Sequence, residues 1–286
     1  MSTGRVCVTG AAGRIGSAAV KELMTRGWEV LATDRRHADL PCPFALTELN
    51  DRPRVQAILE KVDALVHLGE IPMLMRSHRP EELFGLNTAA GSIALQTAAD
   101  LKLRRVVYAS SCQVYGFAFG VGANPNLRMI PDKLPFDETH PTIPNNAYGA
   151  AKVANEIYAY LLGQQQKLSI AIFRFPAILT APASDGLWAR RQSPAGSDDG
   201  LGSFCHVDDA ARAIAMALEH PRPGCEAYNI ASDESLLPVE GIIKQFYPTF
   251  PPLPPDWPQR RSAMLCEKAK EHFGWRHEFK LPPAAG

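Results

Sequence analysis

The stretch Val6-Cys7-Val8-Thr9-Gly10-Ala11-Ala12-Gly13-Arg14-Ile15-Gly16 joins a short apolar run to a segment of helical periodicity. Three glycines at this spacing are typical of a tight turn between a strand and a helix. Gly10 permits the turn, Gly13 lets the backbone approach a ligand, and Gly16 lets the helix pack against the strand. Backbone N–H groups at the start of such a helix attract an anion. The stretch therefore predicts a site for the pyrophosphate of a dinucleotide.

A second predicted strand, residues 28–33, supports this interpretation. It ends in Asp34, which lies 18 residues after Gly16. A carboxylate in this position accepts hydrogen bonds from an adenosine ribose and repels a 2′-phosphate, so the sequence favours NAD over NADP as cofactor. The alternative interpretation is that the glycines only form a turn.

Composition excludes several classes of protein. The length of 286 residues suits one α/β domain with a modest appendage. The 30 basic and 30 acidic residues cancel, and no basic block is interleaved with aromatic residues, which argues against nucleic acid as a partner. The apolar stretches are too short for a membrane span or a signal peptide, so we expect a cytoplasmic protein. The six cysteines show neither Cys-x-x-Cys pairs nor zinc spacing, and we expect reduced thiols and no metal site.

Strand-like runs alternate with helical segments along most of the chain. This order predicts a Rossmann-type α/β fold, a doubly wound parallel sheet covered on both faces. We expect residues 1–175 and 204–232 to form this NAD-binding domain, and residues 176–203 and 233–286 to form a small C-terminal substrate lobe. The expected strands are 5–9, 29–33, 43–46, 64–68, 105–109, 169–173 and 227–231.

Two segments carry candidate catalytic groups. Tyr148 and Lys152 are four residues apart in a predicted helix, 147–162, and so share one helix face. A tyrosine with a pKa near 10 is a poor base at neutral pH, and a lysine cation nearby lowers that pKa. The pair alone also fits any amphipathic helix. Upstream, Ser110 and Ser111 end a predicted parallel strand at its carboxyl end, where open α/β sheets bind ligands.

Several motifs follow one another in a characteristic order. They are the glycine stretch, Val66-His67-Leu68-Gly69, Asn87-Thr-Ala-Ala-Gly91, Ser-Ser-x-x-Val-Tyr-Gly at 110–116, Tyr-x-x-x-Lys at 148–152, and Phe204-Cys-His-Val-Asp-Asp209. With these motifs the chain resembles the extended short-chain dehydrogenase/reductase family, in particular its NAD-dependent epimerase/dehydratase group. The resemblance extends over nearly the whole chain. It implies a homodimer formed through helices 87–99 and 147–162.

The resemblance also implies a role for each motif residue. Tyr148 would be the general acid/base, Lys152 would lower its pKa and hold the nicotinamide ribose, and Ser111 would hydrogen-bond the reacting oxygen. Cys112 would lie beside the substrate. Phe175 would approach the nicotinamide, with core packing as the alternative. The residues expected around NAD are Gly10, Gly13, Arg14, Ile15, Gly16, Asp34, Arg35, Glu48, Leu49, Leu68, Gly69, Glu70, Asn87, Tyr148, Lys152, Phe175 and Pro176. The alternative for Asn87 is a structural or proton-relay role.

The chain departs from the nucleotide-sugar members of that family after its sixth predicted strand. Those nucleotide-sugar members resemble one another in an Arg-x-x-Asn pattern. This chain has Arg174-Phe-Pro-Ala177, with alanine in the place of the asparagine. Only about two dozen residues, 182–203, precede His206, so we expect no nucleotide clamp. This lobe is similar to the uronate dehydrogenase branch, whose substrates are free sugar acids. Arg190 and Arg191 would then bind the substrate carboxylate, unless they are ordinary surface residues.

These inferences combine into one expected function. We expect an NAD-dependent oxidoreductase that transfers a hydride to or from a carbinol or carbonyl carbon of a small polyhydroxylated substrate, such as a sugar or sugar acid. The first alternative is an epimerase that oxidises and reduces the same carbon on a retained NAD. The second is a non-catalytic dinucleotide sensor, because a fold alone does not determine function.

Overall fold

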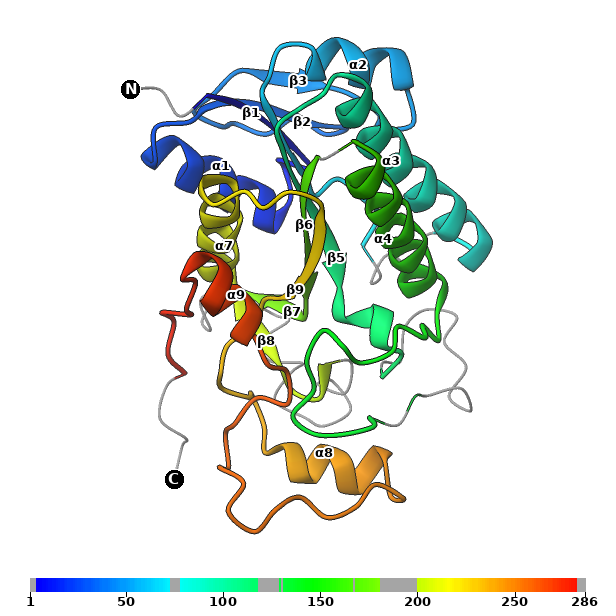
Figure 1. Cartoon of the computed structure of the whole chain (residues 1–286), viewed down its shortest axis with the longest axis vertical. Helices are drawn as coiled ribbons and strands as arrows, with labels where there is room; N and C mark the ends of the chain where they lie inside the picture. Colours follow the sequence, from blue (N-terminus) through cyan, green and yellow to red (C-terminus); the bar gives the residue numbers. More distant parts are fainter. Residues whose placement is uncertain are drawn as a thin grey trace.

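A computed structural model of the chain describes residues 4–72, 78–117, 129, 131–166, 168–180 and 200–281. At its centre is a seven-stranded sheet whose strands all run parallel, in the order β3-β2-β1-β4-β5-β6-β9 (Figure 1). The order proceeds outward from β1 in both directions, which confirms the doubly wound α/β fold. The strands are β1 (Arg5–Thr9), β2 (Glu29–Asp34), β3 (Phe44–Leu46), β4 (Ala64–His67), β5 (Arg105–Ser111), β6 (Ser169–Phe175) and β9 (Cys225–Asn229).

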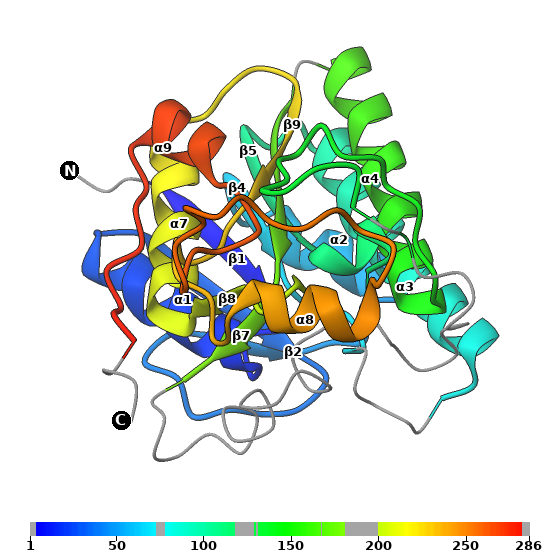
Figure 2. The same ribbon diagram turned by 90° about the horizontal axis from the view of Figure 1, so that it is seen from below.

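Helices cover both faces of this sheet. On one face α1 (Arg14–Thr25) packs against α7 (Val207–Glu219), and on the other lie α2 (Arg52–Leu59), α3 (Pro80–Asp100) and α4 (Ala147–Gln166) (Figures 1 and 2). Because successive side chains of a strand point to opposite faces, Val6 and Val8 belong to the core beneath α1, whereas Cys7 belongs to the core beneath α3. Both faces of the strands are therefore apolar, as a buried parallel sheet requires.

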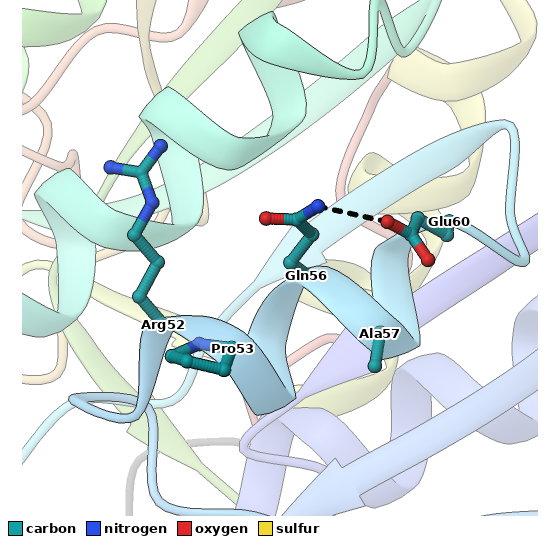
Figure 3. Close-up of a pocket in the computed structure, with 5 residues that line it drawn as sticks. All are labelled: Arg52, Pro53, Gln56, Ala57 and Glu60. Atoms are coloured by element: carbon teal, nitrogen blue, oxygen red, sulfur yellow. Dashed lines mark hydrogen bonds between the residues drawn. The ribbon is translucent and has the colours of Figure 1, made fainter.

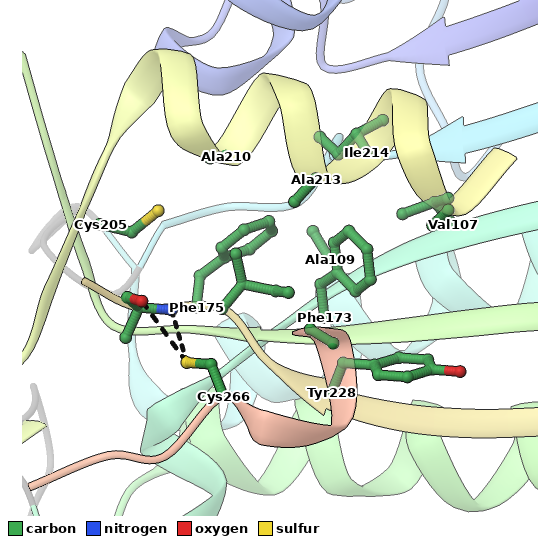
Figure 4. Close-up of a cluster of buried hydrophobic side chains, with 14 of the residues drawn as sticks. Val107, Ala109, Phe173, Phe175, Cys205, Ala210, Ala213, Ile214, Tyr228 and Cys266 are labelled. Carbon is green, nitrogen blue, oxygen red and sulfur yellow. Dashed lines mark hydrogen bonds between the residues drawn. The ribbon is translucent and has the colours of Figure 1, made fainter. Parts of the chain in front are cut away.

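The core beneath α7 is dense in aromatic side chains. Phe173 and Phe175 of β6 lie edge to face, with ring centroids 5.7 Å apart. They pack with Ala213 and Ile214 of α7 (Figure 4). Such contacts between strand and helix hold the carboxyl end of β6 in a fixed position relative to the rest of the sheet.

A smaller unit follows β6. A two-stranded parallel sheet pairs β7 (Ala177–Leu179) with β8 (Phe204–His206), and the later helices are α8 (Val239–Phe246) and α9 (Glu267–Phe273). The expected strands included neither strand of this second sheet, and no helix was expected at α8. Figure 1 shows α8 at the end of the molecule opposite β1 to β3. The chain returns to the main sheet in β9, which begins and ends two residues earlier than expected.

The C-terminal segment is tied to α7 by hydrogen bonds. The carboxylate of Asp209 accepts the backbone N–H groups of Glu278 and Phe279 at 2.9 and 3.1 Å. The buried Trp275 donates its indole N–H to the Asp209 carbonyl at 2.9 Å. Within the described ranges, no helix combines the length and the apolarity needed to cross a bilayer.

Candidate active site

The glycine turn after β1 is packed too closely for side chains at two of its three positions. Gly10 has φ +68°, and a Cβ there would lie 2.7 Å from the backbone nitrogen of Gly69. A Cβ on Gly16 would lie 2.1 Å from the Gly10 carbonyl oxygen. A Cβ on Gly13 would have one neighbouring atom within 4 Å among the described residues, the Gly10 carbonyl oxygen at 3.0 Å. Gly10 and Gly16 thus permit packing, and Gly13 leaves an open stretch of backbone.

Asp34 lies beside this turn at the end of β2. Its carboxylate accepts the backbone N–H of Ala12 at 3.1 Å and that of Arg36 at 3.0 Å. These bonds hold the carboxylate at the edge of the turn, where α1 begins after Gly13 with no side chain capping its first turn. The neighbouring Arg35 is exposed.

The carboxyl end of β4 meets the same edge. The hydroxyl oxygen of Thr9 accepts the backbone N–H groups of Leu68 and Gly69 at 3.1 and 3.2 Å. The side chain of Leu49 lies against Gly69, where an added Cβ would be 2.4 Å from a Leu49 methyl carbon. Glu48, next to Leu49, is exposed. The segments after β1, β2, β3 and β4 therefore converge.

This edge fits a bound dinucleotide. The open backbone at Gly13 and the uncapped start of α1 suit a pyrophosphate, and the carboxylate of Asp34 suits the ribose hydroxyls. Arg14 lies at the same helix start and donates to the Ile178 carbonyl at 2.9 Å, while Ile15 is half-buried against the core. The observation that carries the fit is the open backbone at Gly13, beside the start of α1 that no side chain caps.

The candidate catalytic side chains come from β5 and α4. Ser111 ends β5 and caps a short 3-10 helix, Cys112–Tyr115, by accepting the N–H of Gln113 at 3.2 Å. Its hydroxyl also lowers the pKa of Tyr148. Lys152 Nζ lies 5.5 Å from the ring centroid of Tyr148. Gly149 lets α4 approach the 3-10 helix closely, because a Cβ at this position would lie only 2.5 Å from the Gln113 carbonyl oxygen. The structure thus brings Ser111, Tyr148 and Lys152 together.

The proton affinity of Tyr148 differs from the sequence-based expectation. Burial of the phenol raises its pKa, the charge of Lys152 lowers it, and the carboxylate of Glu70 raises it again, so that the pKa lies above its usual value of 10. The lysine acts in the expected direction. Burial and Glu70 together outweigh the lysine.

The sequence analysis missed the partner of Lys152. Glu70 Oε2 lies 2.8 Å from Lys152 Nζ, and their side chains are only 3 % and 4 % exposed. Lys152 also donates to the Ala109 carbonyl. Burial lowers the pKa of Lys152, but Glu70 and Tyr148 outweigh burial and raise it. Glu70 was expected to line the cofactor, yet its side chain turns toward α4.

The remaining candidates occupy varied positions. The amide of Asn87 accepts the N–H of Ile71 at 2.8 Å and donates to the Ile71 carbonyl at 2.9 Å, which supports its structural alternative. Phe175 is 4 % exposed within the core, which agrees with the packing alternative. Buried Cys112 and Pro176 both lie close to Gly200. Arg190 and Arg191 lie outside the described residues.

A second buried ion pair joins Arg174 of β6 to Glu156 of α4. Arg174 Nε and Nη2 donate to the two carboxylate oxygens of Glu156 at 3.1 and 2.7 Å, and Arg174 Nη1 donates to the Tyr115 hydroxyl at 3.0 Å. Ser110 donates to Glu156 at 2.6 Å. This network joins β5, β6, α4 and the 3-10 helix. Sequence reasoning noted Arg174 only as part of a motif.

A surface hollow also lies along α2, away from the candidate catalytic residues. It is lined by Arg52, Pro53, Gln56, Ala57 and Glu60, and Gln56 donates to Glu60 at 2.9 Å (Figure 3). None of these side chains belongs to the converging edge described above, and all come from α2 or from Glu60, which follows its last residue. The hollow is therefore separate from the candidate active site.

Comparison with known proteins agrees with this arrangement. Residues 6–231 match the family described as the NAD dependent epimerase/dehydratase family. A UDP-glucose 4-epimerase of Lacticaseibacillus casei is 24% identical over 318 residues, covering 96% of this chain and 92% of that protein.

Solved structures share the fold. The UDP-glucose 4-epimerase of Thermus thermophilus in complex with NAD superposes with a TM-score of 0.71 at 23% identity, covering 97% of this chain and 95% of that one. A mutated uronate dehydrogenase superposes with a TM-score of 0.68 at 23% identity, covering 96% and 82%. At this identity the likeness shows the fold alone.

Proposed function

This chain belongs to the NAD-dependent epimerase/dehydratase family, and we propose that it moves a hydride between NAD and a carbinol or carbonyl carbon of a small polyhydroxylated substrate. The observation that carries the proposal is the meeting of Ser111, Tyr148 and Lys152 at the sheet edge that also holds the glycine turn. The Ser111 hydroxyl also lowers the pKa of the Tyr148 phenol, which supports a place for both groups beside one substrate oxygen.

Each residue of this set has a distinct task in oxidation. Tyr148, as phenolate, accepts the proton of the substrate hydroxyl as the carbon loses its hydride and becomes a carbonyl. Ser111 donates a hydrogen bond to the reacting oxygen, and the Lys152 cation stabilises the phenolate. When bound, NAD supplies the hydride acceptor. In the reverse direction Tyr148 returns the proton to the oxygen.

We propose a free sugar acid as the substrate class, in place of a nucleotide sugar. Ala177, which stands where nucleotide-sugar members have asparagine, lies in β7 and is 8% exposed, so it offers a methyl group and no amide. The segment between β7 and β8 is also short. From the sequence alone, Arg190 and Arg191 are proposed to bind the carboxylate.

A direct assay tests both the reaction and the substrate class. Purified protein is incubated with NAD and, in parallel, with hexuronic acids, neutral aldoses and UDP-sugars, while the absorbance of reduced cofactor is followed. We expect NADH formation with a free sugar acid. Interconversion of a UDP-sugar without release of NADH would favour the epimerase alternative. No change with any substrate class and no NAD binding would refute the proposal.

We further propose that the protein forms a homodimer through α3 and α4, which pack side by side on one face of the sheet (Figure 2). Phe84 of α3 and Ile157 and Leu161 of α4 are 40%, 65% and 46% exposed. Large apolar side chains exposed on two adjacent helices favour an interaction surface there. Sedimentation should show a dimer that Ile157→Glu converts to monomer. A monomeric native protein would contradict this proposal.

The cysteines support a proposal about location. All six are free thiols, and four of them are buried. Thiols in this state suit a reducing compartment, and we propose the cytoplasm. Fractionation of the cells that produce the protein would test this placement.

A further inference from the structure

The carboxylate of Glu70 lies in a buried polar network that the proposed chemistry does not use. Oε1 accepts the Tyr108 hydroxyl at 2.8 Å and the amide of Asn155 at 3.4 Å, and Oε2 lies 2.8 Å from Lys152 Nζ. The Glu70 side chain is 3 % exposed. A buried carboxylate persists where donors and an opposite charge surround it, as they do here. The lysine of the candidate catalytic set is thus one half of an ion pair.

A neutral histidine, His67, lies next to the Oε1 atom of Glu70. The Thr9 hydroxyl oxygen accepts two backbone N–H groups, so its own proton points to His67 Nδ1, 3.0 Å away. Burial lowers the pKa of His67 to about 4, and the neutral ring therefore carries its proton on Nε2, 3.8 Å from Glu70 Oε1. His67 adds no positive charge at neutral pH. Lys152 is the cation paired with Glu70.

Several ionisable groups face this pair from the surrounding elements. His67 comes from β4, Tyr108 from β5, and Cys112 from the 3-10 helix, while Tyr148 and Glu156 come from α4. The pKa of Tyr108 is raised by its burial and by Glu70, so Tyr108 stays neutral and acts as a donor to Glu70. The charges nearest to Tyr148 at neutral pH are therefore the Lys152 cation and the Glu70 anion.

These two charges act on Tyr148 in opposite directions. A cation about 4–6 Å away lowers the pKa of a phenol by roughly 1–3 units, and an anion at similar range raises it. A lysine already paired with a carboxylate thus acidifies its tyrosine less than a lone lysine does. Tyr148 keeps its proton to a higher pH as a result.

We propose that Glu70 is a positioning residue that holds Lys152 in place and, by its negative charge, reduces the electrostatic effect of that lysine on Tyr148. The proposal rests on the proposed function, because the consequence matters only if Tyr148 transfers the proton. If Glu70 merely fixed the segment after β4, its charge would have no effect, and an uncharged side chain of equal size would serve as well.

A titration of the ligand-free protein separates these two roles. Tyrosine is isotope-labelled at Cζ, the chemical shift of Tyr148 is followed against pH by NMR, and Tyr148→Phe assigns the signal. We compare the wild type with Glu70→Gln, which keeps the size and removes the charge, and with Glu70→Asp, which keeps the charge. The midpoint should fall by about one pH unit or more in the Gln variant. It should stay close to the wild-type value in the Asp variant.

Equal midpoints in the wild type and Glu70→Gln would overturn the proposal, as would equal shifts in the Gln and Asp variants. If Glu70→Gln does not fold, Glu70→Ala removes the same charge and leaves room for water, and its midpoint must fall as well. An unchanged midpoint in a folded Ala variant would also refute the role of Glu70.

The pH dependence of turnover gives a second readout. The rising limb of kcat for oxidation should move to lower pH in Glu70→Gln by about the same amount as the titration, because the coupled groups share apparent pKa values. The NMR titration needs no substrate. An unchanged midpoint therefore refutes the role of Glu70 and leaves the oxidoreductase proposal intact. A shifted midpoint without any NADH formation refutes the proposed function alone.

Discussion

Replacement of Arg174 by methionine should destabilise the protein strongly, although Arg174 is not one of the candidate catalytic residues. The side chains of Arg174 and Glu156 are 5 % and 4 % exposed, with 2.7 Å between Nη2 and Oε2. Methionine fills a similar volume but leaves the Glu156 carboxylate buried, with the Ser110 hydroxyl as its remaining donor among the contacts described above. Leaving one charge of a buried pair without its partner costs about 3–5 kcal/mol. We expect a loss of this size in the free energy of unfolding.

A surface pair of the same length provides the matched control. Arg52 and Asp100 also lie 2.7 Å apart, but their side chains are 50% and 45% exposed. Solvent screens such a pair, and Arg52→Ala should cost less than about 1 kcal/mol. The two pairs have equal N···O distances and differ in burial and in the number of hydrogen bonds that the arginine donates.

A double variant identifies the source of the loss. Arg174→Met combined with Glu156→Leu removes both charges, and it should be more stable than Arg174→Met alone. Urea unfolding of the whole chain, followed by circular dichroism, measures the three differences. If Arg174→Met costs no more than Arg52→Ala, or if the double variant is less stable than the single one, the reasoning fails.

Three further predictions concern the site and the C-terminal lobe. Tyr148→Phe should lower turnover by about 100-fold or more with little change in NAD affinity by calorimetry, and near-normal turnover would remove Tyr148 from the mechanism. NAD should bind more tightly than NADP, and Asp34→Ser should narrow the difference in dissociation constants; tighter binding of NADP to the native protein would contradict this. The hydrogen bond from His277 lowers the pKa of Asp233 to about 2, and the same bond raises the pKa of His277 above 6.5. Asp233 therefore stabilises the fold above pH 3.8, and this stabilisation is lost as the pH falls toward 2. His277 stabilises the fold below pH 6.5, and this stabilisation is lost as the pH rises through its raised pKa. The Tm difference between wild type and Asp233→Asn should therefore be largest near about pH 5 and should shrink at lower and at higher pH.

Local patterns in the sequence were sufficient to predict the main sheet and its helices. Apolar runs, glycines at a turn and helical spacing are properties of neighbouring residues, so β1 and α4 were predicted within a few residues of their bounds. The sheet of β7 and β8 was missed because each strand has three residues and its pairing joins positions far apart in the chain.

The candidate site shows the same limit. Ser111, Tyr148 and Lys152 were predicted because they stand in motifs, and their proximity agrees with that prediction. The partner of Lys152 was not predicted, since Glu70 lies 82 positions earlier and no spacing rule connects the two. The net pKa of Tyr148 depends on burial and on both charges, which only the folded chain brings together.

The pairing of β7 with β8 has a consequence for how such a protein can change in evolution. In-register partners such as Ala177 and Phe204 hold both ends of the intervening segment on the body of the fold. Doubling the number of residues between two fixed ends costs only about 0.6 kcal/mol of loop-closure free energy. Natural selection can therefore exchange one such segment for another, and a laboratory can graft one, while the candidate catalytic residues on the main sheet are inherited unchanged.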